Sequence, residues 1–201
     1  MITIGIIMIT VLVSLLAFNN PEIFEKLCLK PALMHGHKSE WFRLISCAFV
    51  HADAGHLIFN MLTLWFFGRM LEGHVFSELQ FILFYLSAIP LSALPDYQQQ
   101  KTNQLYKACG ASGAISAVLL SLVLFNPWGV VYIKFIIPVY FVLFAVGYLL
   151  YSWYKSRRQD DNIAHGVHLW GALYGIAFTL LTQPSSLSVF LEQVKKAPFL
   201  H

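Results

Sequence analysis

Residues 162–175 read NIAHGVHLWGALYG, an apolar stretch that carries two histidines and three glycines. His168, Gly171 and Gly175 follow one another at offsets of three and four residues, which places them on one face of a helix. The spacing Gly171-x-x-x-Gly175 is the small-residue pattern that lets two membrane helices approach closely. The stretch therefore predicts a helix whose glycine face packs directly against a neighbour, with His168 where that contact begins.

A second stretch, GASGAIS at residues 110–116, offers the matching surface. Gly113 and Ala117 lie four residues apart and form a stripe of small side chains on one helix face. Packing this stripe against the glycine face brings the starts of the two helices together. Ser112 and His168 are then expected to be neighbours.

The composition of the 201-residue chain indicates the environment of these helices. Hydrophobic residues make up 58% of it and charged residues only 11%, where a soluble domain carries about 25% charged residues. So few ions do not cover the surface of a globule of this size, and the mean hydropathy of +0.65 agrees. We therefore expect a membrane protein. Its net charge of +3 is too small and scattered to favour a nucleic-acid partner.

Six apolar runs suited to a bilayer core of about 30 Å lie between turn and charge signals. They cover approximately residues 1–18, 51–71, 75–94, 110–126, 130–154 and 163–181. This predicts an all-α membrane protein with six transmembrane helices in a single domain, residues 1–201. The first run lacks the basic start and cleavage site of a signal peptide, so it is expected to be a retained span. Residues 20–50 mix charge with Leu, Trp and Phe, which predicts a folded, half-immersed loop.

Polar side chains lie near the starts of the second, fourth and sixth runs, where an unpartnered polar group in hydrocarbon is costly. Helices two apart in such a chain cross in the same direction, so these starts lie at one membrane face. They carry His56 and Asn60, which share a helix face, then Ser112, and then His168. The three sequences are therefore expected to form one site.

The residue types of this site predict acyl-transfer chemistry. A serine hydroxyl becomes a nucleophile when a base within hydrogen-bond reach takes its proton, and neutral histidine does so near neutral pH. Ser112 is the expected nucleophile and His168 its base. The Ser112 backbone N–H, the His56 ring and the Asn60 amide are expected to stabilise the oxyanion. No carboxylate lies within these helices, so we expect a Ser-His dyad; Asp53 and Asp161 are the nearest acids in sequence.

At these residues the chain resembles the rhomboid family of intramembrane serine proteases. The resemblance covers about residues 41–175, with motifs in order on alternate helices. They are Trp41-x-Arg43, His51, His56-x-x-x-Asn60, Gly68, Glu72, Gly110-x-Ser112-Gly113, Ala164-His165 and His168-x-x-Gly171-x-x-x-Gly175. The resemblance implies the same roles for Ser112, His168, His56 and Asn60. It also implies a six-helix rhomboid-like bundle with a half-immersed first loop, a fifth helix acting as a lateral gate, and transmembrane protein substrates cut near the membrane surface.

The chain departs from the family pattern in two respects. Many members have an aromatic residue under the histidine ring, one turn after the serine, where this chain has Ser116, which would itself hydrogen-bond to the ring. Nine of the 13 Lys and Arg residues also lie in loops on the active-site face, which by the positive-inside rule would be cytoplasmic. The resemblance instead places that face outside, and we follow it.

Other interpretations remain open at this point. An inactive relative that binds membrane clients would share the fold, although such a protein usually lacks Ser112 or His168. The four histidines at positions 51, 56, 165 and 168 would suit a metal, but no acid or cysteine completes the set, so no metal or cofactor is expected. The expected partners are transmembrane substrates and the lipid bilayer. Because nothing resembles a transit peptide, a multi-pass protein of a bacterial cytoplasmic membrane is expected; substrate identity and oligomeric state are open.

The cysteines predict no covalent framework. Cys28, Cys47 and Cys109 are odd in number and have no C-x-x-C spacing. They are expected to be free thiols.

Overall fold

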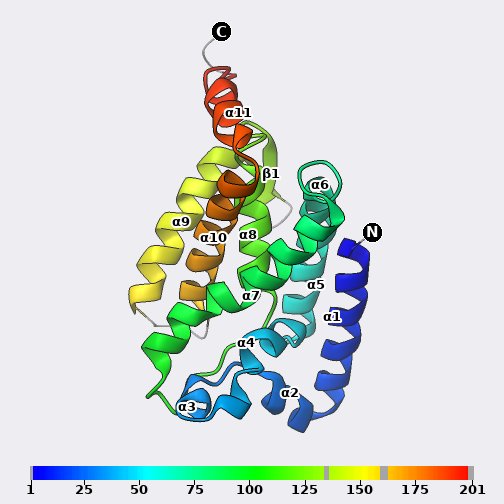
Figure 1. Cartoon of the computed structure of the whole chain (residues 1–201), viewed down its shortest axis with the longest axis vertical. Helices are drawn as coiled ribbons and strands as arrows, with labels where there is room; N and C mark the ends of the chain where they lie inside the picture. The colour runs from blue at the N-terminus through cyan, green and yellow to red at the C-terminus, as the bar shows by residue number, and fades with distance from the viewer. Residues whose placement is uncertain (1, 134–135, 159–162, 199–201) are drawn as a thin grey trace.

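A computed structural model describes residues 2–133, 136–158 and 163–198. Within these ranges the protein is mainly helical, as predicted, and its long helices form a bundle with short helices gathered at one end (Figure 1). The α-helices outside residues 20–50 are α1 (Ile2–Asn19), α5 (Ala54–Thr63), α6 (Arg69–Leu71), α7 (Glu78–Gln100), α8 (Ser112–Leu122), α9 (Phe141–Arg158), α10 (His165–Thr182) and α11 (Ser185–Val194). A π-helical turn, η3 (Leu64–Gly68), joins α5 to α6.

Residues 20–50, called the first loop below, fold into short helices at one end of the bundle. These are α2 (Pro21–Leu27), α3 (Pro31–Met34), η1 (Lys38–Glu40), α4 (Arg43–Ser46) and η2 (Cys47–Phe49). The buried Arg43 guanidinium donates to the carbonyl oxygens of Glu25 and Cys28, each at 2.9 Å, and to the Glu40 carboxylate at 2.6 Å. One cation thus ties three parts of the loop together. The prediction of a folded first loop is confirmed, while its immersion in the membrane stays a prediction.

The packing of α8 against α10 follows the predicted glycine stripe. A Cβ built on Gly171 would overlap the carbonyl oxygen of Gly113 and lie 2.8 Å from its carbonyl carbon. A Cβ on Gly175 would lie 2.6 Å from the Cα of Ala117. No side chain larger than hydrogen fits at either glycine, so the two backbones touch. This prediction is confirmed, and it sets the distance between the two helix starts.

Length and composition identify spans among the described residues. The helices α1 and α7 are each long and apolar enough to cross a membrane. Residues 38–49 and 54–71 also pass this test as a pair, with a bend of 78° between their helices. The chain is therefore an integral membrane protein, and the count of six spans stays a prediction.

The fifth apolar run differs from the predicted helix over about residues 130–154. Its first part is an antiparallel hairpin, β1 (Val130–Ile133) and β2 (Ile137–Tyr140), and α9 begins only at Phe141. The β-branched residues in this part favour strands. Pro138 lacks a backbone N–H, so it interrupts a helix yet fits a two-stranded sheet, in which each strand is an edge.

The third run also differs at its end. The sequence predicts that this run stops at Pro95, but α7 continues through Pro90 and Pro95 to Gln100. The extra turn carries Asp96, which is buried and accepts a hydrogen bond from the Tyr106 hydroxyl at 2.6 Å. A Cβ on Gly166 would overlap the Asp96 carboxylate, so this acid lies against the first turn of α10.

Candidate active site

Ser112 and His168 meet where α8 and α10 begin. His168 Nε2 lies 2.7 Å from Ser112 Oγ, which is a hydrogen-bond distance. The serine is the first residue of α8 and the histidine lies in the first turn of α10. Because the backbones touch at Gly171, one turn further along, side chains at the two starts reach each other. With Nε2 as the acceptor, the serine hydroxyl donates to the histidine.

The His168 ring is held by a residue that the sequence analysis did not single out for this role. The ring of Tyr148, from α9, stacks beside it at an interplanar angle of 20°, with centroids 6.3 Å apart. The Tyr148 hydroxyl lies 2.5 Å from Ser116 Oγ, and Ser116 donates to the Ser112 carbonyl oxygen at 2.7 Å. Ser116 therefore contacts Tyr148 rather than the histidine. The aromatic neighbour of His168 comes from another helix.

His51 fixes the backbone just before the serine. The Ala111 N–H donates to His51 Nε2 at 3.4 Å, so His51 Nδ1 carries the proton and donates to Ser14 Oγ at 2.9 Å. Ser14, on α1, in turn donates to the Phe49 carbonyl oxygen at 2.9 Å. This chain of bonds links α1, the first loop and the start of α8. His51 thus has a structural role, and Ser14 is a supporting residue that the sequence analysis missed.

The His56 ring lies against Gly110, two residues before Ser112. Gly110 has φ +108°, in the left-handed region, and a Cβ there would lie 2.6 Å from His56 Cε1 and 2.8 Å from Nε2. Only glycine satisfies both the backbone angle and the close approach. The N-terminus of α5 is capped by Asp53, whose carboxylate accepts the His56 backbone N–H at 2.8 Å. Asp53 thus orients this helix and does not contact His168.

Asn60 lies one turn beyond His56 on the same helix. It is 3% exposed, and its amide nitrogen has no hydrogen-bond partner in the described part of the chain. A buried donor left unpaired costs about 1–3 kcal/mol. An oxygen acceptor that came within reach of this nitrogen would remove that cost.

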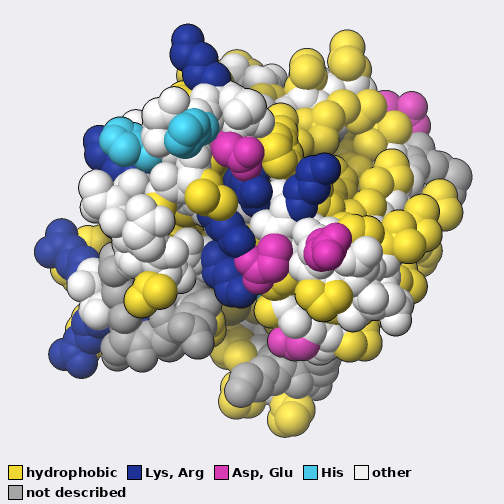
Figure 2. Space-filling view, turned by 90° about the horizontal axis from the view of Figure 1, so that it is seen from below, with side chains coloured by type: hydrophobic (Ala, Val, Ile, Leu, Met, Phe, Trp, Pro, Cys, Tyr) yellow, Lys and Arg dark blue, Asp and Glu magenta, His cyan; other side chains and the backbone are white. Residues whose placement is uncertain are grey.

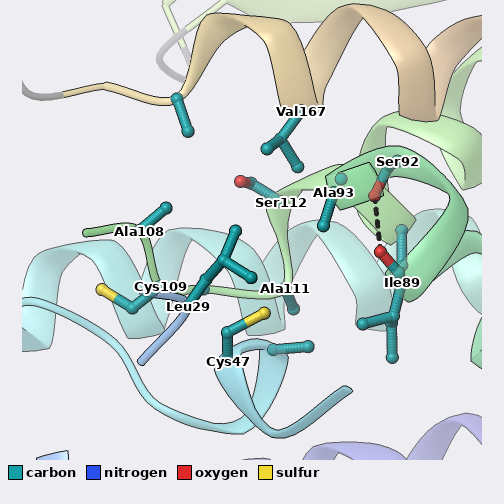
Figure 3. A pocket seen from close by; sticks show the side chains of 15 residues that line it. Leu29, Cys47, Ile89, Ser92, Ala93, Ala108, Cys109, Ala111, Ser112 and Val167 are labelled. Carbon is teal, nitrogen blue, oxygen red and sulfur yellow. Dashed lines mark hydrogen bonds between the residues drawn. The ribbon is translucent and has the colours of Figure 1, made fainter. Parts of the chain in front are cut away.

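A cavity of about 20 Å³ lies beside Ser112. Figure 3 shows the Ser112 hydroxyl among apolar neighbours, with Ala108, Ala111 and Val167 around it and Ser92 bonded to the Ile89 carbonyl oxygen on the far side. A space of this size holds about one water molecule. The serine thus lines a small, mostly apolar chamber together with the segment that precedes α8.

Two further residues, His165 and Asp96, lie at the first turn of α10, near the site. The ring of His165 meets those of His168 and Tyr151 edge to face, with centroids 5.9 and 5.4 Å apart. Asp96 lies against the same helix turn. The sequence did not predict an acid at this place, because Asp96 follows the proline at which the run is predicted to end. Asp161 lies outside the described residues. Among the described residues, no group of three or more His, Cys, Asp or Glu side chains could hold a metal ion.

Charged side chains gather on the end of the molecule formed by the first loop (Figure 2). Glu25 binds both Lys107, at 2.8 Å, and Lys30. Hydrogen bonds from Lys107 and Lys30 lower the pKa of Glu25 to about 2. The carboxylate stays ionised at neutral pH and connects the first loop to the segment that leads into α8. A groove of about 350 Å³ lies beside it.

Comparison with known proteins supplies a family. The profile of the Rhomboid domain matches residues 38–185, which include Ser112, His168, His56 and Asn60. The chain is 29% identical over 143 residues to RHOMBOID-like protein 12, mitochondrial, of Arabidopsis thaliana, covering 64% of this chain and 43% of that protein.

Two bacterial relatives are also similar. The putative rhomboid protease YdcA of Bacillus subtilis is 32% identical over 147 residues, which cover 71% of this chain and 67% of the relative. Rhomboid protease GlpG of Salmonella paratyphi A is 25% identical over 147 residues, covering 72% of this chain and 49% of the relative. The chain thus spans less than half the length of two of these three relatives.

Proposed function

Since the chain belongs to the rhomboid family, we propose that it is an intramembrane serine endopeptidase that cleaves transmembrane segments through a Ser112-His168 dyad. The observation that carries the proposal is the 2.7 Å contact between Ser112 Oγ and His168 Nε2. A serine is activated by a base at such a distance. Relatives that carry the name of protease support the same reaction.

In the proposed reaction His168 takes the proton of the Ser112 hydroxyl while the serine oxygen attacks the scissile carbonyl. His168 then gives the proton to the leaving amine. Water later attacks the acyl-enzyme, and His168 takes the proton of the water and returns it to Ser112 Oγ. The stacked Tyr148 ring supports this role, because it limits rotation of the imidazole that must face first the serine and then the leaving group.

Charge on the carbonyl oxygen needs donors that are already in place. The first backbone N–H groups of α8, beginning at Ser112, have no partner within the helix and carry its positive dipole end. The unpaired Asn60 amide and the His56 ring over Gly110 are the proposed side-chain donors. Loss of one such donor costs about 10²- to 10³-fold in rate in serine proteases.

The proposed substrate class follows from depth and surroundings. The helix α8 has 11 residues and, at 1.5 Å per residue, is about 16 Å long, roughly half a bilayer core. A central helix this short supports a reaction below the membrane surface within a bundle of six spans and a half-immersed first loop. A bacterial cytoplasmic membrane is the proposed location; an organelle membrane is the alternative raised by the mitochondrial relative.

Substitution of Tyr148 tests how the base is held. Tyr148→Phe keeps the ring beside His168 and loses only the contact with Ser116, so kcat should stay within about threefold of wild type. Tyr148→Ala removes the ring and should lower kcat about 10- to 100-fold with little change in KM, because a misplaced base costs rate. Kinetics on a transmembrane peptide in detergent measure both. Equal kcat for Tyr148→Ala and wild type would contradict the positioning role.

The proposal is tested by a fluorophosphonate probe on the purified protein. The probe should form an adduct that peptide mapping by mass spectrometry locates on Ser112, and a chelator should not prevent it. The same preparation in liposomes should cut a transmembrane peptide. A folded protein that neither labels nor cuts would favour the inactive, client-binding relative. Labelling without cleavage of any transmembrane peptide would refute the substrate class.

A further inference from the structure

Two cysteines from distant parts of the chain lie opposite each other beside the site. Leu29 in the first loop and Ala108 form an isolated antiparallel bridge, with backbone bonds of 2.9 and 3.0 Å in the two directions. In an antiparallel pair the next residues across are Cys28 and Cys109. Cys109 is three residues before Ser112, and Cys28 lies before the residues 38–185 that match the family profile.

The backbone geometry suits a disulfide between them. Leu29 and Ala108 exchange both hydrogen bonds, and in regular antiparallel geometry the pair adjacent to such a pair is not hydrogen-bonded and has Cα atoms about 4.5 Å apart. Disulfides join Cα atoms at about 4.4–6.8 Å. Each thiol is the largest influence on the pKa of the other, which indicates that the two side chains lie close together. A bond between the two sulfurs therefore needs little movement of the backbone.

The two thiols differ in a way that assigns their order of reaction. Cys109 is partly exposed, whereas Cys28 is fully buried. The neighbouring Cys28 thiol lowers the pKa of the Cys109 thiol, whereas Cys109 together with burial raises the pKa of Cys28. Cys109 is thus the thiol that a reagent in solvent meets first, and the one that ionises more readily.

The third cysteine is not the partner. Figure 3 shows the sulfur of Cys109 pointing away from the cavity, while that of Cys47 points along the cavity wall in the other direction. The Cys47 thiol is buried, and its sulfur lies 3.8 Å from the Leu44 carbonyl oxygen. Cys47 therefore serves as an internal control.

We propose that Cys28 and Cys109 form an oxidisable pair that a disulfide-containing oxidant, a small molecule or a protein, closes into a disulfide. The Cys109 thiolate attacks one sulfur of the oxidant, forms a mixed disulfide and releases the oxidant's first thiolate. The Cys28 thiol then loses its proton and attacks Cys109 Sγ, which releases the second. Two thiols are oxidised, the oxidant's disulfide is reduced to two thiols, and both protons pass to these.

Closure would fasten the first loop to the segment that carries the nucleophile. That segment is already attached through the Ala108 bridge and through the Gly110 N–H, which donates to the Cys47 carbonyl oxygen at 2.8 Å. The disulfide closes a loop of about 80 residues, and stabilisation grows with loop length in the chain-entropy account. The thermal midpoint of the oxidised protein should therefore be several degrees higher than that of the reduced protein. This readout does not depend on protease activity.

The test uses the full chain in detergent, treated with oxidised glutathione, denatured and alkylated. Intact mass should show one alkyl group per oxidised chain instead of three, and peptide mapping should find Cys28 linked to Cys109. Dithiothreitol should restore three alkyl groups and lower the thermal midpoint. Three alkyl groups after oxidation, or a link through Cys47, would overturn the proposal, and both results come from the wild-type chain.

Single variants test the order of attack. Cys47→Ser should form the same link and show the same thermal shift. Cys28→Ser should stop at a glutathione adduct on Cys109, because nothing resolves it. Cys109→Ser should give neither a link nor an adduct on the buried Cys28. An adduct on Cys28 in that variant would refute the assigned order.

Discussion

Replacement of either Ser112 or His168 by alanine is expected to reduce kcat/KM for a transmembrane peptide by about 10⁴- to 10⁶-fold. The two side chains share one proton across 2.7 Å, so removal of either ends nucleophilic attack by the serine. Residual hydrolysis would come from the oxyanion donors alone. The measurement is single-turnover cleavage in liposomes, with fluorophosphonate labelling as a second readout.

The double variant makes the prediction sharper. The effects of residues that act as one unit are not additive. The double variant, Ser112→Ala with His168→Ala, should therefore be at most about threefold slower than the slower single variant. Exposed residues away from the site provide matched controls: Ser188→Ala and His74→Ala should cleave at the wild-type rate. Wild-type cleavage by Ser112→Ala would remove the proposed nucleophile. Multiplied losses in the double variant would argue that the two residues act separately.

Gly171→Ala is expected to cause a large loss of stability, about 3 kcal/mol. The added Cβ would overlap the Gly113 carbonyl oxygen and lie 2.8 and 3.0 Å from its carbonyl carbon and Cα. These are backbone atoms that no side-chain rotation moves away, so α8 and α10 must separate. Because the Ser112-His168 contact lies one turn from this point, cleavage should also fall by about 100-fold.

Gly147→Ala is the control for this change. Gly147 lies in α9, and a Cβ there would meet no atom within 4 Å. Alanine favours helix over glycine by up to about 1 kcal/mol, so this variant should be as stable as wild type or slightly more so. Thermal midpoints in detergent, with cleavage measured below the lower midpoint, give the comparison. Equal midpoints for Gly171→Ala and Gly147→Ala would refute the close helix contact.

Some of the candidate site followed from local pattern. His168, Gly171 and Gly175 share a face in any helix, and the same holds for His56 with Asn60. The contact between Ser112 and His168 was therefore predictable, because packing the two stripes of small residues against each other brings the two helix starts together.

Other features depended on neighbours that no local pattern reveals. Tyr148 reaches His168 from α9, and Ser14 supports His51 from α1. The prolines of α7 did not end it, and the β-branched run before Phe141 formed a hairpin rather than the start of a helix. Helical periodicity does not show which helices are neighbours. It also does not show where an apolar segment forms a strand instead of a helix, or whether a helix continues past a proline.

The sequence by itself determined the membrane class, because 11% charge does not solvate a chain of 201 residues, and it determined which polar side chains share a helix face. Only the tertiary structure decided what holds those side chains and what lies opposite them. Tyr148 beside His168 and Cys28 opposite Cys109 are both of this kind. The physical reason is range: a helix fixes contacts over three or four residues, whereas these pairs are 20 and 81 residues apart along the chain and meet only when the whole bundle packs.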